Sequence, residues 1–260
     1  MPRDAIVPVV VRILLFLGSL LAMCHALGSP NGVSLPEAGN TRDDFAVLAY
    51  LPEWRYGGAN WDTICRHVSH LILFSLEVKH DGSIGALDRI PNKMLMAEAQ
   101  EAATEHNTAL LICFGGNGRS QGFSRMVASS AARKKFLRNL VGLMDKHALD
   151  GVDYNWEYPG YEMGRGYLSD KEIKADYKGL MKLFQETRAL LGPRAPITMS
   201  YYPDGRQEEL LRKGEAAAQV DYLMMMSYDQ NGKHHSEARW GNKMIDQGVS
   251  VLPPNQLDAR

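Results

Sequence analysis

The sequence predicts an α/β protein in which a parallel sheet is covered by helices. Short apolar runs alternate with longer amphipathic stretches from about residue 45 onward. The runs are almost continuously apolar, as is typical of strands that are buried on both faces. A closed barrel of eight strand-helix units and an open doubly wound sheet both fit this alternation. The segment after the first run, Leu51–Gly58, lacks the Gly-x-Gly-x-x-Gly pattern of a dinucleotide-binding sheet.

Six apolar runs are the expected strands: Phe45–Tyr50, His70–Leu76, Ala109–Phe114, Gly151–Trp156, Pro196–Tyr201 and Val220–Ser227. Three stretches with helical periodicity are the expected helices: Asn92–His106, Ser130–His147 and Asp170–Leu191. Ser169 or Asp170 is the expected cap of the last helix, and Gly192-Pro193 ends it. The chain after Ser227 is too short for two further units of roughly 30 residues each.

Composition and charge exclude several classes of protein. Lys and Arg number 29 and Asp and Glu number 30, which gives a net charge of −1. Binding to nucleic acid or to anionic lipid through bulk charge requires a concentrated positive field, so we expect neither. Hydrophobic residues make up 45% of the chain and charged residues 23%, as in ordinary globular proteins.

The N-terminal residues have the features of a secretory signal. The apolar run Ile13–Ala22 follows basic residues and is shorter than the roughly 20 residues needed to span a bilayer. Small residues at positions −3 and −1 favour cleavage after Ala26. We therefore expect a signal peptide over 1–26, a flexible lead-in over 27–44, and a secreted, extracellular protein with no membrane attachment after cleavage. The alternative is a membrane anchor that runs from Val7 to Ala26.

Two cysteines, Cys65 and Cys113, remain after this cleavage. They could form a disulfide in an oxidising compartment, or both could be buried thiols. The strongly apolar surroundings of Cys113 favour buried thiols.

The fourth expected strand carries the residues that point to chemistry. Side chains alternate between the two faces of a strand, so Asp153, Asn155 and Glu157 share one face. Burying two carboxyl groups and an amide in a row is costly unless they bond to one another or to a ligand. Glu157 lies at the carboxyl end of the strand, where α/β folds place their sites. A carboxyl group whose proton affinity is raised by a neighbouring charge is a candidate general acid.

The segment Asp150-Gly-Val-Asp-Tyr-Asn-Trp-Glu157 resembles the Asp-x-x-Asp-x-Asp-x-Glu signature of glycoside hydrolase family 18, the chitinases and their relatives. Three more segments resemble the first, third and sixth strands of that family: Ala46–Trp54, Cys113–Gly116 and Met226–Asp229. The resemblance implies a (β/α)8 TIM barrel of the chitinase type over 45–260. We expect this barrel to be truncated after about six strand-helix units and to lack its C-terminal strands.

The resemblance also implies a function, the cleavage of β-1,4-linked N-acetylglucosamine polymers by a retaining, substrate-assisted mechanism. Glu157 would protonate the glycosidic oxygen, and the acetamido group of the sugar would attack C1. Asn155 would hold the acetamide N–H and Tyr228 would donate to the acetamide oxygen. Asp153 would support this arrangement through a hydrogen bond to Tyr50.

The residues implied as substrate contacts are Tyr50, Trp54, Tyr158, Met226 and Asp229. The expected partner is chitin or an N-acetylglucosamine oligosaccharide, and the expected protein is a monomer. We expect no cofactor and no metal.

Two residues depart from the family pattern. Asn155 stands where the family usually has Asp, and it cannot supply a negative charge to the reaction. Cys113 stands in place of Ser, and its thiol is a weaker hydrogen-bond partner for Asp153. Two alternatives therefore stay open: a catalytically inactive chitin-binding lectin on the same fold, and an endo-β-N-acetylglucosaminidase that acts on N-glycans.

Overall fold

The computed structural model describes residues 46–202 and 205–226 of the chain. The expected signal peptide and lead-in lie outside these residues, as do Tyr228 and Asp229. Among the described residues, no helix combines the length and the apolar character needed to cross a membrane.

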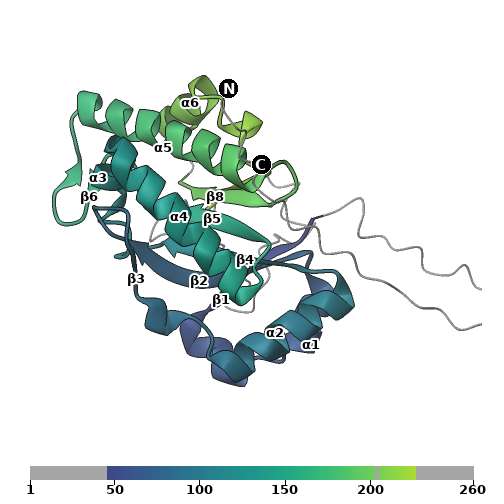
Figure 1. The fold of residues 1–260 in the computed structure, drawn as a ribbon. Coiled ribbons are helices and arrows are strands. Elements are labelled where there is room, and N and C mark those ends of the chain that lie inside the picture. The colour runs from purple at the N-terminus through teal and green to yellow at the C-terminus, as the bar shows by residue number, and fades with distance from the viewer. Residues whose placement is uncertain (1–45, 203–204, 227–260) are drawn as a thin grey trace, which may run out of the picture. The chain divides into compact units, whose positions relative to one another are not determined.

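The central feature is a parallel sheet with the strand order β1-β2-β4-β5-β8-β9 (Figure 1). The strands are β1 (Leu48–Pro52), β2 (His70–Val78), β4 (Ala109–Gly115), β5 (Gly151–Asn155), β8 (Ile197–Tyr201) and β9 (Tyr222–Met225). A short strand, β3 (Ile84–Gly85), pairs antiparallel with β2, and β6 (Tyr161–Glu162) and β7 (Gly166–Tyr167) form a separate hairpin. The predicted α/β class with a parallel sheet is confirmed.

Helices connect the strands and cover one face of the sheet. They are α1 (Trp61–His67), α2 (Lys93–His106), α3 (Phe123–Ala128), α4 (Ser130–His147), α5 (Asp170–Leu191) and α6 (Gly205–Lys213). Short 3-10 helices are η1 (Glu53–Gly58), η2 (Leu87–Arg89) and η3 (Ala216–Ala218). Helices α4 and α5 lie next to each other across the outer face of the sheet (Figure 1).

The two longest helices begin and end where the sequence predicts. The Ser169 side chain accepts the Glu172 N–H and the Glu172 carboxylate accepts the Ser169 N–H, which together form a capping box at the start of α5. Gly192 follows the last residue of that helix with φ 78°, a conformation that favours glycine. Helix α2 begins one residue later than predicted, because Asn92 is its cap rather than its first residue.

The ends of the outer strands differ from the prediction. The first strand was expected over Phe45–Tyr50, but β1 begins at Leu48 and pairs with β2 as far as Pro52. The sixth was expected over Val220–Ser227, and β9 covers Tyr222–Met225. Strand ends are set by backbone pairing with the neighbouring strand, which hydrophobicity does not report.

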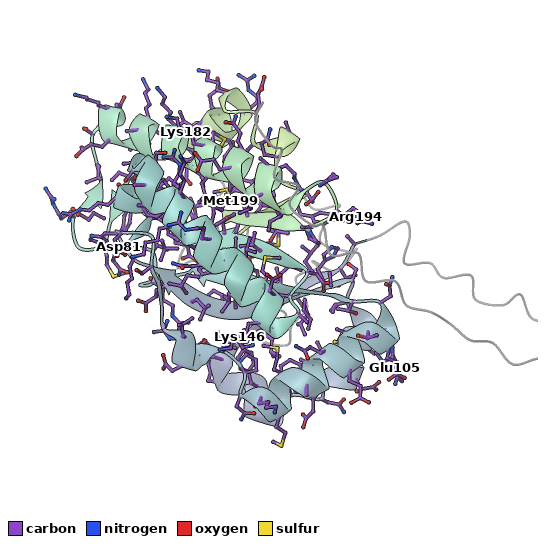
Figure 2. All side chains as sticks on the ribbon, in the orientation of Figure 1. Asp81, Glu105, Lys146, Lys182, Arg194 and Met199 are labelled. Atoms are coloured by element: carbon purple, nitrogen blue, oxygen red, sulfur yellow. The ribbon has the colours of Figure 1, made fainter. Side chains whose placement is uncertain are left out.

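The main apolar core lies between the sheet and the helices. Met199 of β8 belongs to this core and is fully buried, whereas Lys182 of α5 and Lys146 of α4 are exposed (Figure 2). A smaller cluster of Ile72, Leu111 and Cys113 lies on the opposite face of the sheet. The two faces are therefore chemically different, with most of the apolar burial on the helical side.

The sheet curls toward this second face. The rings of His70 on β2 and Tyr222 on β9 have centroids 5.2 Å apart, although three strands separate β2 from β9 in the sheet order. Neighbouring strands lie about 4.8 Å apart, so a flat sheet would hold these two strands roughly 19 Å apart. The curl encloses the inner face and brings side chains from distant strands together there.

Candidate active site

Asp153 of β5 lies at the centre of the inner face and is fully buried. Its Oδ2 accepts a hydrogen bond from the Tyr50 hydroxyl at 2.9 Å, and its Oδ1 accepts one from Thr198 Oγ1 at 2.6 Å. Cys113 is the register partner of Asp153 on β4, and its thiol also bonds to the carboxyl group. Strands β1, β4 and β8 thus place three side chains around the carboxyl group that β5 carries.

Burial controls the ionisation of this group. It raises the pKa of Asp153 above its ordinary value, although hydrogen bonds from Thr198, Cys113 and Tyr50 act in the opposite direction. Burial, followed by the charge of Asp153, raises the pKa values of the Cys113 thiol and the Tyr50 hydroxyl well above their usual range. Both groups therefore keep their protons and act as donors at neutral pH.

Asn155 and Glu157 follow Asp153 at the carboxyl end of β5. The backbone oxygen of Asn155 accepts the Gly116 N–H at 2.6 Å and the Ser120 hydroxyl at 3.3 Å. The same Ser120 hydroxyl oxygen accepts the backbone N–H of Glu157 at 3.1 Å. The β4–α3 loop thereby fixes the backbone on which Asn155 and Glu157 stand.

The side chains of these two residues have different surroundings. Asn155 is 6% exposed, and its Oδ1 has no hydrogen-bond partner among the described residues. Glu157 is half-buried and lies two residues past the end of β5. Solvent exposure therefore increases along the predicted row, from the fully buried Asp153 to the half-buried Glu157.

The expected substrate contacts fall in different places. Trp54 lies on η1 directly after β1 and is 67% exposed. Tyr158 is half-buried beside Glu157, and Met226 is buried just past the end of β9. Tyr228 and Asp229 lie outside the described residues.

Thr198 and Ser200 are site residues that the sequence reasoning missed. Thr198 donates to Asp153, and the Ser200 hydroxyl lies 2.6 Å from that of Tyr50. The signal was present, since polar and apolar residues alternate along Ile197–Tyr201, and both polar residues are buried.

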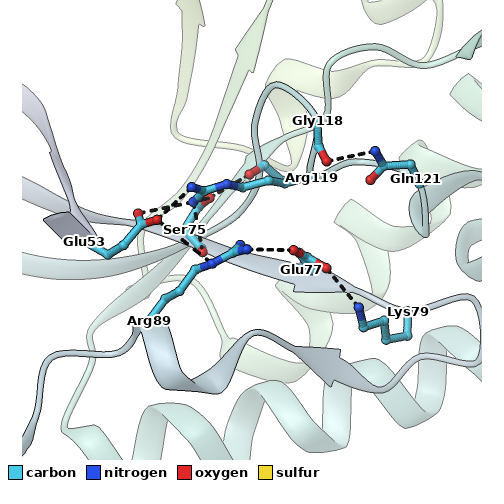
Figure 3. Close-up of polar contacts among 9 residues, drawn as sticks. Glu53, Ser75, Glu77, Lys79, Arg89, Gly118, Arg119 and Gln121 are labelled. Atoms are coloured by element: carbon cyan, nitrogen blue, oxygen red, sulfur yellow. Dashed lines mark hydrogen bonds and ion pairs between the residues drawn. The ribbon is translucent and has the colours of Figure 1, made fainter. Parts of the chain in front are cut away.

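A charge network at the carboxyl ends of β1 and β2 was also missed (Figure 3). The Arg119 guanidinium donates to both carboxylate oxygens of Glu53, at 2.7 and 3.2 Å, and to Ser75 Oγ at 3.1 Å. Arg89 lies 3.0 Å from Glu77 and 3.9 Å from Glu53. This network fixes the start of η1, the segment that carries Trp54.

The network also sets the ionisation of Glu53. Partial burial acts to raise the pKa of this carboxyl group, but the hydrogen bonds and charge of Arg119, together with the charge of Arg89, bring the pKa below its ordinary value. Glu53 is therefore a permanent anion at neutral pH. An ion pair with two parallel N–H···O bonds is geometrically specific, so it orients the loop as well as holding it.

A separate group of possible metal ligands lies on α1 and α2. Ligand atoms of Asp62, Glu105 and His106 are within 4.8 Å of one another, beside a surface hollow of about 300 Å³. Asp62 is already paired with His106 at 2.7 Å and with Arg66 at 2.6 Å. These contacts explain the cluster as a link between two helices.

A curled parallel sheet with helices on its outer face and polar side chains on its inner face defines a barrel-type α/β fold. The chain belongs to a specific family of this kind, since the model of glycosyl hydrolases family 18 matches residues 46–249. The predicted family is therefore confirmed.

Relatives and solved structures agree with this assignment. Chitinase A1 of Niallia circulans is 30% identical over 133 residues, which are 50% of this chain and 19% of the relative. Chitinase 1 of Aphanocladium album is 23% identical over 250 residues, which are 84% of this chain and 57% of the relative. The chain thus spans less than two thirds of the length of each of these relatives.

The fold is shared with solved chitinases. The Group IV chitinase of Ostrinia furnacalis has a TM-score of 0.63 and 21% identity, with 74% of this chain and 54% of that chain covered. The same chitinase has been solved in complex with allosamidin. The chitinase-type barrel arrangement that the resemblance implied is therefore confirmed for the part of the chain that the structure describes.

Proposed function

We propose that this chain hydrolyses β-1,4-linked N-acetylglucosamine polymers, chitin or chitooligosaccharides, with retention and with assistance from the substrate. Membership of glycosyl hydrolases family 18 and the chitinase relatives support the substrate class. The placement of Asp153, Asn155 and Glu157 along one strand end supports the chemistry.

The proposed reaction has two steps. In the first, Glu157 gives its proton to the glycosidic oxygen and the C1–O bond breaks, while the acetamido oxygen of the same sugar forms a bond to C1. This intermediate is a cyclic oxazolinium ion. In the second, water attacks C1, gives a proton to the Glu157 carboxylate and breaks the C1–acetamide bond. Two inversions at C1 give net retention.

The buried side chain of Asn155 is the observation that carries the proposal. Its Oδ1 is an acceptor without a partner among the described residues. Such a buried atom costs about 1–3 kcal/mol, and a ligand donor that reaches it removes that cost. The acetamide N–H of N-acetylglucosamine is a donor of this kind. Asn155 would hold it two residues before the acid Glu157, while Asp153, Tyr50 and Tyr228 would support the bound group.

The same residue favours a second candidate function. Asn155 is neutral, whereas a carboxylate at this position would stabilise the positive charge of the intermediate. A chitin-binding lectin needs the hydrogen bond but does not need the charge. Retention of Glu157 favours the hydrolase over the lectin. The third possibility, an endo-β-N-acetylglucosaminidase acting on N-glycans, uses the same acid and the same acetamide contact.

Hydrolysis of a fluorogenic chitobioside by the wild type and by Glu157→Gln tests the proposal. The hydrolase predicts turnover that is lost in Glu157→Gln, with the melting temperature retained. Binding of chitooligosaccharides without turnover by either protein identifies the lectin instead. Release of glycans from a glycoprotein identifies the third possibility. Absence of both binding and turnover rejects all three.

We also propose that the protein is secreted after removal of residues 1–26. The apolar run Ile13–Ala22 supports this proposal. Expression of the full chain in a secreting host, with N-terminal sequencing of the product, tests it. A product that begins at Leu27 in the medium supports it, and a product that stays with the membrane fraction supports the anchor.

A further inference from the structure

Four tyrosines form a row beside Glu157: three lie in the segment that follows Glu157, and one lies directly after β8. The rings of Tyr202 and Tyr158 have centroids 5.4 Å apart, those of Tyr158 and Tyr161 are 6.0 Å apart, and those of Tyr161 and Tyr167 are 5.3 Å apart. Tyr161 and Tyr167 are cross-strand partners in the β6–β7 hairpin. We call these four residues the tyrosine row.

The outer half of the tyrosine row is open to solvent. Tyr161 is 38% exposed and Tyr167 is 48% exposed, while Tyr158 and Tyr202 are half-buried. Aromatic rings combine a large apolar face with a polar tip, which suits partners that are apolar on one side and hydroxylated at their edges. The faces of sugar rings, which are C–H surface bordered by hydroxyl groups, have this character.

The hairpin that carries the row is held in place at its base. The Gly160 N–H donates to Asp176 Oδ2 at 2.8 Å, and the Gly160 oxygen accepts the Leu168 N–H at 2.8 Å. Asp176 is 7% exposed and also accepts the Ser124 hydroxyl at 2.6 Å. These bonds tie both ends of the hairpin to α3 and α5.

The ring of Tyr167 is held from its hydroxyl end as well. Its hydroxyl accepts the Gln207 side-chain N–H at 3.0 Å. Gln207 is 2% exposed, and its Oε1 accepts the Tyr177 hydroxyl at 2.9 Å. A buried amide therefore orients an exposed ring. A surface fixed in this way binds without first being ordered, which lowers the entropic cost of association.

The tyrosine row is continuous with the candidate active site. Tyr158 is the residue after Glu157, and Tyr202 directly follows β8, whose Thr198 bonds Asp153. The tip of the hairpin reaches the β4–α3 loop. The Met163 methyl group lies 3.9 Å from the place that a Cβ atom would occupy if Gly118 carried a side chain. The row therefore borders the strand ends on the side of β5 and β8.

We propose that the tyrosine row, through Tyr161 and Tyr167, binds sugar units beyond the linkage that Glu157 cleaves, so that the protein prefers oligosaccharides longer than a disaccharide. This inference rests on the proposed function. It adds to that function a preference for chain length and two residues that determine it.

The test compares kcat/KM on a fluorogenic chitobioside and on chitohexaose for the wild type, Tyr161→Ala, Tyr167→Ala and the double variant. An aromatic contact contributes about 0.5–1.5 kcal/mol, so each single variant loses about two- to tenfold on the hexamer. The double variant loses about 4- to 100-fold on the hexamer if the two contacts are independent, and all variants keep the wild-type value on the chitobioside. Tyr161→Phe, which keeps the ring and leaves the bond between Gln207 and Tyr167 intact, is the matched control and retains most of the hexamer activity.

Several outcomes overturn the inference. One is a variant that loses kcat/KM equally on the chitobioside and on the hexamer. Another is a double variant that cleaves the hexamer as well as the wild type does, in an experiment where the wild type also cleaves the chitobioside. Failure of the wild type to bind or cleave either substrate rejects the proposed function itself, and this inference with it. Should alanine prevent folding, Tyr161→Leu and Tyr167→Leu keep the apolar bulk and take its place. Titration of chitohexaose into variants that also carry Glu157→Gln measures the same effect as a higher Kd. This measurement does not depend on hydrolysis of the substrate.

Discussion

The hydroxyl of Tyr50 lies 2.6 Å from Oγ of Ser200, although β2, β4 and β5 separate the strands that carry them. The same hydroxyl donates to Asp153 at 2.9 Å. One tyrosine therefore reaches across the inner face and joins three strands at a buried carboxyl group. This relationship links the curl of the sheet to the ionisation of the site, and the first two predictions test it.

Replacement of Tyr50 by Phe removes a donor from a fully buried carboxyl group. We expect the free energy of unfolding to fall by about 1–3 kcal/mol, because the remaining partner is left under-satisfied. Urea denaturation at neutral pH measures this change. Ser200→Ala is the matched control and should cost less, since it leaves the bond from Tyr50 to Asp153 intact. A Phe variant as stable as the wild type would contradict the prediction.

Replacement of Asp153 by Asn should make stability depend less on pH. The pKa of Asp153 in the folded protein is raised above the ordinary value of 3.8, so folding favours its protonated form. Its contribution to stability is therefore present below about pH 4 and is lost as the pH rises through the folded pKa. Since Asn does not titrate, the stability of Asp153→Asn relative to the wild type should increase between about pH 3.5 and 7.

Urea midpoints of both proteins across this pH range measure the difference. Glu209→Gln supplies a control of opposite sign, because hydrogen bonds from Arg212 and Lys213 lower the pKa of Glu209 to about 2. The stabilising contribution of Glu209 is present above its unfolded pKa and is lost as the pH falls toward 2. The stability of the wild type relative to Glu209→Gln should therefore increase as the pH rises. If the urea midpoints of the wild type and of Asp153→Asn changed equally with pH, the raised pKa of Asp153 would be refuted.

Replacement of Asn155 by Asp should raise kcat on the chitobioside by about 10²-fold. A carboxylate supplies a charge to the cationic intermediate, and single electrostatic groups at transition states contribute on the order of 10²–10³ in rate. Initial rates at saturating substrate measure the effect, and Asn155→Ala, which removes the acceptor, should lower kcat instead. An Asp variant with unchanged turnover would indicate that the site is built for binding.

Replacement of Arg119 by Met should destabilise the protein by about 1–3 kcal/mol, because it leaves Glu53 with the more distant Arg89 as its cation. The same change releases the start of η1, so KM on chitohexaose should rise through the displacement of Trp54. Thermal unfolding and steady-state kinetics measure the two effects. The exposed Arg125→Met is the control, and equal unfolding midpoints for the two variants would count against the network.

The long elements could be predicted from the sequence, because their signals are local. Helix α5 has a capping box, a regular apolar stripe and a terminal glycine, and its predicted bounds, Asp170–Leu191, are those of the structure. The alternation along β5 likewise placed Tyr154 under the helices and Asp153 on the inner face. Both predictions rest on the spacing of neighbouring residues.

The parts that were missed depend on contacts between distant segments. Arg119 and Glu53 are 66 residues apart; Arg119 lies in the β4–α3 loop and Glu53 begins the short 3-10 helix η1, and neither segment has periodicity. The β6–β7 hairpin has two-residue strands, which are too short for any pattern of hydrophobicity to reveal. Thr198 and Ser200 were visible as an alternation, but their role becomes clear once the sheet curls and brings Tyr50 to them.

The separation of the two apolar clusters has a consequence for how such proteins evolve. The large cluster beneath the helices supplies most of the apolar burial, and the inner face contributes few apolar contacts. Substitutions at the open end of the inner face, as at Asn155, can therefore alter chemistry while the large outer cluster stays intact, so that natural selection can convert a catalyst into a sugar receptor, or the reverse, on an unchanged outer scaffold.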